Sequence, residues 1–164
     1  MEELRIQRGR AAAPLPPSSP VEFIFNTAEA AVVLGEADPD YVQARLVDYA
    51  ATIVHLLAIK NPSYHDRFVE SVRKAVESVV GAQLPPFSPR SRAYELELRE
   101  YLSLYAGRQG VREALRAALP WNPGGIATDV DEAEAVARLA RRILYVAAKT
   151  FLHEVGLLPL VKRW

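Results

Sequence analysis

Three histidines are the side chains of this sequence best suited to acid–base chemistry or metal binding: His55, His65 and His153. None has a partner at the spacing of a zinc site, and none follows a glutamate by three residues, as a helical di-iron site requires. The chain has no cysteine, which excludes thiolate ligands, disulfide bonds and cysteine nucleophiles. We therefore expect ordinary helical histidines, with neither a metal nor a cofactor.

Motifs for other catalytic chemistry are not found either. The NPGG turn at residues 122–125 lacks the Gly-Lys-Ser/Thr ending of a phosphate-binding loop, and no Gly-x-Ser-x-Gly elbow occurs. Helical ribonucleases of the HEPN class place histidine closer after arginine than the nine residues between Arg45 and His55 or the ten between Arg142 and His153. The sequence predicts a protein that is not an enzyme and has no small-molecule substrate.

Basic side chains recur on one face of a long helix predicted for residues 128–155. At 100° per residue, Arg138, Arg142 and Lys149 fall within about 40° of one another, with Tyr145 beside them. The opposite face is apolar and consists of Val136, Leu139, Ala140, Ile143 and Ala147. Such a row suits a phosphate backbone, but bases near a helix C-terminus also complement the helix macrodipole. The sequence leaves both interpretations open.

A second basic row lies on a shorter helix predicted for residues 109–119. Arg108, Arg112 and Arg116 follow one another at steps of four, beside the apolar Val111, Leu115, Ala118 and Leu119. These arginines either contact phosphate or extend over the edge of the core. The preceding helix and glycine turn suggest a helix–turn–helix, but Glu113 occupies a position that is apolar in that motif. This argues against a domain that reads an operator sequence.

The remaining pattern predicts an all-α fold. An N-cap residue precedes proline at 38–39, 61–62 and 88–89, and apolar residues recur at helical spacing after each pair. Another helix is expected at about 27–37. Only VEFIF, residues 21–25, reads as extended, and one short run cannot form a sheet. We expect a single domain of five or six helices that form a bundle.

The N-terminal segment differs from the rest in composition. Residues 8–20, RGRAAAPLPPSSP, are basic and proline-rich, and prolines favour polyproline II at ~3.1 Å per residue. We therefore divide the chain into an extended arm, residues 1–25, and a helical bundle domain, residues 26–164. Because such an arm adds nothing to the core, we expect it to gain order from another molecule. Its apolar residues would then contact a neighbouring subunit: Leu15, Val21, Phe23 and Phe25.

Charge is distributed unevenly although the net charge is zero. Residues 21–82 carry five basic and nine acidic side chains, whereas residues 83–164 carry twelve and nine. One end of the molecule is therefore suited to face an anion. The longest uncharged apolar run, residues 49–59, is shorter than the ~20 residues of a membrane span, and the N-terminus lacks a secretory apolar region. We expect no transmembrane segment.

The basic proline-rich arm, RIQRGRAAAPLPPSSP, the helical remainder and the lack of catalytic motifs together resemble the major capsid proteins of filamentous viruses of hyperthermophilic archaea. Those proteins are small, cysteine-poor and all-helical. They wrap double-stranded DNA, held in A-form, inside a helical filament. The resemblance is one of layout, without a diagnostic motif. An excess of arginine over lysine, 16 to 4, fits a thermophilic source, although a GC-rich genome has the same effect.

The resemblance implies a structural, DNA-binding virion protein that is present in the host cytoplasm during assembly. Its implied partners are double-stranded DNA and other copies of the chain, with or without a paralogous coat protein. Only basic residues carry over, as candidate phosphate contacts: Arg5, Arg8, Arg10, Arg108, Arg112, Arg116, Arg138, Arg142 and Lys149.

Two other classes of function fit the same pattern. A small helical subunit of a ribonucleoprotein, such as those of archaeal CRISPR effector complexes, would bind RNA or single strands and would stay monomeric or dimeric when purified alone. A helical enzyme with an unrecognised site is the third alternative.

Overall fold

The structure is a computed structural model that describes residues 19–118 and 129–159. Within these ranges the chain forms six α-helices and no β-strand, which confirms the predicted all-α class. The helices are α1 (Pro20–Val33), α2 (Pro39–Lys60), α3 (Ser63–Val80), α4 (Tyr94–Leu104), α5 (Gln109–Ala118) and α6 (Asp129–Glu154).

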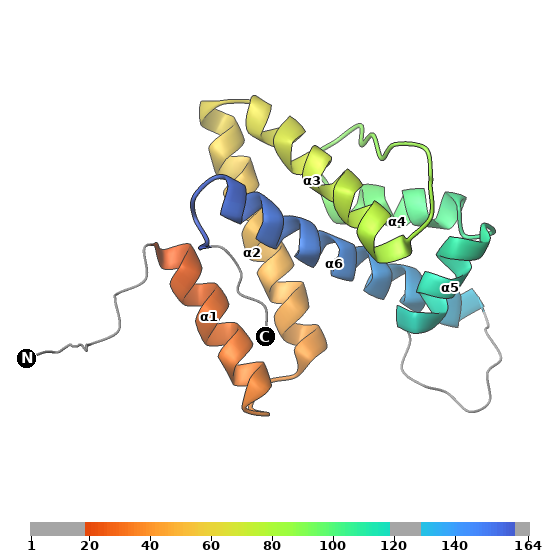
Figure 1. Ribbon diagram of the computed structural model, residues 1–164, viewed down its shortest axis with the longest axis horizontal. Helices are drawn as coiled ribbons and strands as arrows, with labels where there is room; N and C mark the ends of the chain where they lie inside the picture. Colours follow the sequence, from red (N-terminus) through yellow and green to blue (C-terminus); the bar gives the residue numbers. More distant parts are fainter. Residues whose placement is uncertain (1–18, 119–128, 160–164) are drawn as a thin grey trace, which may run out of the picture.

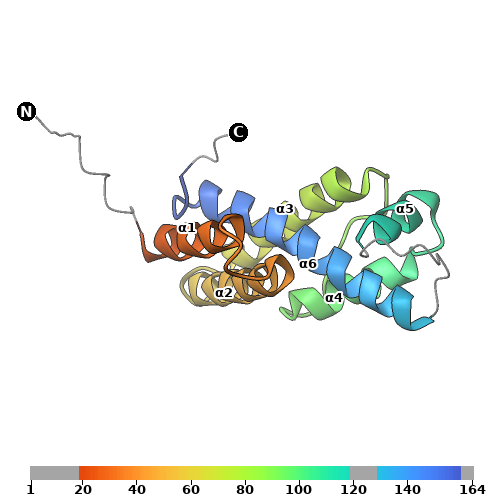
Figure 2. The same ribbon diagram turned by 90° about the horizontal axis from the view of Figure 1, so that it is seen from below.

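α6 is the central element of the bundle. It contacts α2, α3, α4 and α5, while α1 packs on α2. Figure 1 shows α6 crossing the middle of the molecule, with α1 toward one end and α5 toward the other, and Figure 2 shows the same order from below. Phe68, near the start of α3, packs edge to face on Phe151, near the end of α6, with ring centroids 5.5 Å apart. Helices α3 and α6 are therefore antiparallel.

The apolar face predicted for the last helix is buried as expected. Val136, Leu139, Ala140, Ile143 and Ala147 are all in the core. α6 begins at Asp129, one residue from the predicted start, and Gly156 follows it at φ 83°. A residue with a Cβ rarely adopts that backbone, which explains the glycine after the helix.

Local capping decides two of the three proline-marked helix starts. The carboxylate of Asp38 accepts the N–H of Tyr41 at 2.9 Å, so α2 begins at Pro39 as predicted. The side chain of Asn61 accepts the N–H of Ser63, where α3 begins, one residue after the expected position.

The third helix start was predicted wrongly, because α4 begins at Tyr94 and not at Pro89. Arg73 of α3 holds the preceding segment in place: its Nε donates to the carbonyl of Phe87 at 2.8 Å, and Phe87 is buried. Ser91 instead accepts the N–H of Ala93 just before the helix. A tertiary contact therefore overrides the local Ser-Pro signal.

The extended conformation predicted for residues 21–25 is also wrong. Pro20 stands at the first helical position, and Ser19 caps the helix by accepting the N–H of Glu22 at 3.2 Å. Val21 and Phe25, four residues apart, then lie on one face and are buried in the chain's own core. The prediction that these two side chains pack on a neighbouring subunit is corrected accordingly, whereas Phe23 is 57% exposed.

Among the described residues, α2 is the one helix that by length and composition is apolar enough to cross a membrane. Six of its side chains are buried in the bundle: Leu46, Val47, Ala50, Ile53, Val54 and Ala58. Leu56 and Ile59 are 59% and 76% exposed. The absence of a transmembrane segment stays a prediction.

Candidate nucleic-acid interface

The basic row of α6 lies against α1 and α2, and most of its charge is paired there. Lys149 donates to Glu29 Oε2 of α1 at 2.7 Å, and the Tyr145 hydroxyl donates to the same oxygen. Lys149 also lies over the Tyr145 ring, 5.4 Å from its centroid. Burial, followed by this hydrogen bond to the carboxylate, raises the pKa of Tyr145 above its ordinary value. The three side chains fasten α1 to α6.

Arg138 is engaged in the same way at the other end of the row. Its Nη1 donates to Asp40 Oδ2 of α2 at 2.6 Å, and its Nε donates to Glu134 Oε2 at 3.0 Å. The hydrogen bond to Glu134 and the proximity of Asp40 raise the pKa of the guanidinium. Arg142, by contrast, is exposed and has no carboxylate within reach among the residues described. Of the predicted row, this residue alone keeps a charge available to an external anion.

Two arginines of α5 and the one just before it form the more open set, here called the α5 basic face and defined as Arg108, Arg112 and Arg116. All three are exposed, and none pairs with a carboxylate in the described part of the chain. Arg108 lies over the ring of Tyr105, 5.0 Å from its centroid. The single acid on this helix, Glu113, accepts a hydrogen bond from Gln109. Three cations thus face outward over about two turns.

Packing explains why these arginines face outward. Val111 and Leu115 are buried beneath α5, against the core formed with α3 and α6. Gly110, at the start of the helix, lies so close to Ala82 that a Cβ there would stand 2.5 Å from the alanine methyl group. α5 is therefore seated firmly, and its basic face is held at one end of the molecule (Figure 1).

The histidines are placed where they can support packing. His65 Nδ1 and the Tyr94 hydroxyl are 2.7 Å apart, and the Tyr94 ring contacts the rings of both His65 and His55, with centroids 5.4 and 5.6 Å away. Burial and the charge of Arg92 lower the pKa of His65, and burial raises that of Tyr94 to about 12. No group of three potential metal ligands occurs in residues 19–118 and 129–159. The pairing of Tyr94 with two histidines has no signal in the sequence, because α2, α3 and α4 each supply one ring.

Arg5, Arg8, Arg10 and Leu15 lie outside the described residues, so their predicted contacts stay predictions. No protein-family model, curated protein or solved structure matches this chain.

Proposed function

We propose that this protein is a structural subunit that polymerises into a helical filament around double-stranded DNA and holds it by sequence-independent phosphate contacts. The observation that carries the proposal is the α5 basic face, three outward arginines without carboxylate partners in the described part of the chain. Exposed arginines over a firmly packed helix suit a phosphate backbone, and contacts to phosphate read no bases. Arg142 adds a further exposed cation, whereas Arg138 and Lys149 are left out because carboxylates neutralise them.

The distribution of charge along the molecule supports one orientation on DNA. Residues 20–37, which include α1, contain three glutamates and no basic residue, and α1 lies toward the opposite end from α5 (Figures 1 and 2). A subunit with its α5 end inward places positive charge on DNA and negative charge away from it. Zero net charge is then compatible with a coat protein, because phosphate contact needs positive charge on one side.

Arginine contacts of this kind release counterions from DNA, so binding weakens steeply as salt is added. Many weak contacts along a polymer add together without any single strong site. Exclusion of water by a continuous protein coat would favour the A-like geometry of the duplex.

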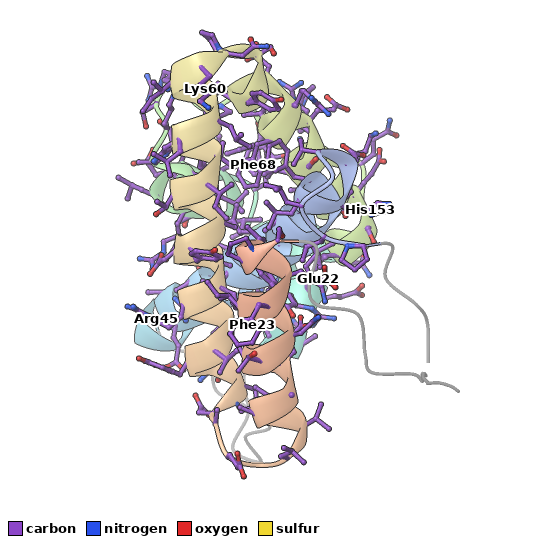
Figure 3. The ribbon with its side chains drawn as sticks, turned by 90° about the vertical axis from the view of Figure 1, so that its left-hand side faces the viewer. Glu22, Phe23, Arg45, Lys60, Phe68 and His153 are labelled. Atoms are coloured by element: carbon purple, nitrogen blue, oxygen red, sulfur yellow. The ribbon has the colours of Figure 1, made fainter. Side chains whose placement is uncertain are left out.

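The double variant Arg112→Ala with Arg116→Ala tests the proposal. We expect it to lower the salt dependence of duplex binding, measured by fluorescence anisotropy, by about 1.8 in the log–log slope, since each phosphate contact contributes ~0.9. The matched control is Arg45→Ala with Lys60→Ala, which removes two exposed charges from α2 (both labelled in Figure 3). Equal losses in both variants, or binding of single strands in preference to duplex, would contradict the proposal. Electron micrographs of the wild-type chain with duplex should show filaments.

A further inference from the structure

A groove with no assigned occupant lies beneath the segment that joins α3 to α4. Its volume is about 330 Å³, and its lining includes Glu77, Gln83, Pro85, Pro86, Phe87 and Tyr101. Phe87 and Tyr101 meet edge to face, with centroids 5.5 Å apart, and the Tyr101 hydroxyl donates to the carbonyl of Pro85. Because Phe87 is itself buried, Tyr101 supplies the accessible aromatic surface beside two exposed prolines; this hollow is here called the loop groove.

The chemistry of the loop groove fits a polyproline II segment. Proline-rich peptides dock in aromatic-lined grooves because their conformation is largely preformed and little entropy is lost on binding. This chain carries such a segment itself, APLPP at residues 13–17, ahead of the first described residue.

Charge complementarity points to the same occupant. Glu77 lines the groove, is exposed, and forms no ion pair within the described ranges. Arg73 also lines the groove, but its guanidinium is already engaged by Glu70 at 3.2 Å and by the carbonyl of Phe87. Arg8 and Arg10 precede the proline run of the arm, so a docked arm would bring a cation to the free carboxylate.

The length of the chain between the proline run and α1 decides whether the arm can reach the groove of its own copy or only that of another copy. The Ser19 hydroxyl is tied to the carbonyl of Leu157, beyond the end of α6, at 2.8 Å. Along α3, the groove begins at about Val76, at least ~12 Å from Phe68. Phe68 packs beside Phe151 of α6, and Leu157 lies beyond Phe151 in the direction away from the groove.

Ser19 and the groove are therefore roughly 20 Å apart along the bundle, and Figure 1 shows α1 and the α3–α4 segment on different sides of it. The three prolines, Pro14, Pro16 and Pro17, lie at most five residues before Ser19, a reach of ~16 Å in polyproline II, and Ala13 reaches ~19 Å. These prolines cannot enter the groove of their own chain.

We propose that residues 13–17 of one copy dock in the loop groove of the next copy. The contact is heterologous, because arm and groove are different surfaces, and a heterologous contact that does not close into a ring builds an open helical polymer. This inference deepens the proposed filament assembly and rests on it, since it names the contact that links successive subunits.

Engineered cysteines test the contact directly, because the natural chain contains none. Full-length chains carrying Leu15→Cys are mixed with tagged full-length chains carrying Gln83→Cys, under mild oxidation and without nucleic acid. We expect a disulfide-linked heterodimer on a non-reducing gel. The matched control replaces Gln83→Cys by Thr52→Cys, which is also an exposed position, on α2. A single chain with both Leu15→Cys and Gln83→Cys should form a ladder of linked oligomers. A cross-linked monomer, or no more heterodimer than in the control, would overturn the inference.

A peptide assay guards against a cysteine variant that fails to fold. A fluorescent peptide of residues 8–20 is titrated with the full-length chain, again without nucleic acid. We expect Glu77→Lys to weaken binding by about two- to fivefold, as for an exposed ion pair. Glu36→Lys, a charge reversal outside the groove, should have no effect. A peptide with Arg10→Glu should bind Glu77→Arg better than it binds the wild-type chain, and indifference of the peptide to Glu77 would refute the proposed pairing.

The two assays separate this inference from the proposed function. Loss of the ladder with duplex binding intact refutes the arm contact alone. An intact ladder with no duplex binding refutes the DNA-coating function and leaves contact between copies in place.

Discussion

Replacement of Glu29 by alanine tests whether the basic row of α6 fastens α1 rather than binding phosphate. Glu29 Oε2 accepts hydrogen bonds from both Tyr145 and Lys149. A hydrogen bond to a charged group contributes ~1.5–3 kcal/mol, and a partly exposed ion pair at most ~1 kcal/mol. The Glu29 and Lys149 side chains are 31% and 24% exposed, so we take the lower end of each range. Glu29→Ala should therefore reduce the free energy of unfolding by about 2 kcal/mol.

The assay is urea unfolding followed by circular dichroism, with a double-mutant cycle of Glu29→Ala and Tyr145→Phe. We expect a coupling energy of about 1.5 kcal/mol between the two positions, because the removal of either partner breaks the same hydrogen bond. Glu36→Ala is the matched control, since it removes one carboxylate just after α1 from a side chain without an ion pair in the described residues. It should leave stability within ~0.5 kcal/mol of the wild type.

A spectroscopic readout checks the same contact independently of stability. Glu29→Gln should lower the pKa of Tyr145 toward its ordinary value, while burial still keeps that pKa raised. The tyrosinate absorbance of each chain, compared with its Tyr145→Phe counterpart, isolates this one residue. A coupling energy near zero together with an unchanged titration would refute the fastening and would return Lys149 to the candidate phosphate contacts.

Two further predictions concern the packing that positions the α5 basic face and the histidines. Tyr94 keeps its proton in the folded state because burial raises its pKa from 10.0 to about 12, so the stability it contributes is full below pH 10 and is lost as pH rises through 12. That shift corresponds to about 3 kcal/mol. Tyr94→Phe should remove this part of the pH dependence of urea unfolding, and an unchanged pH profile would contradict the prediction. Gly110→Ala should destabilise the fold by about 1–3 kcal/mol, because its Cβ would meet Ala82 at 2.5 Å. A gain in thermal stability, as helix propensity alone predicts, would show that α5 is seated differently.

A local signal was sufficient at the start of α2, whereas the Ser19–Pro20 cap that starts α1 was not recognised in the sequence. Asp38 and Pro39 predict the start of α2 because an N-cap and a fixed φ act within one turn. The same signal failed at Ser88 and Pro89, where Arg73 of another helix holds the backbone of Phe87. The prediction of an extended conformation for residues 21–25 was wrong because a five-residue apolar run does not distinguish a strand from part of a helix.

The sequence alone determined the all-α class, the buried face of α6 and the two rows of basic residues, since all three follow from helical periodicity. Which of those charges remain available was decided only by the tertiary structure. Arg138 meets Asp40 from 98 positions away, and Lys149 meets Glu29 from 120 positions away. No local pattern encodes such pairs, because they depend on how α1, α2 and α6 pack against one another. The arginines of α5 are left outward because no acidic helix among the described residues covers them.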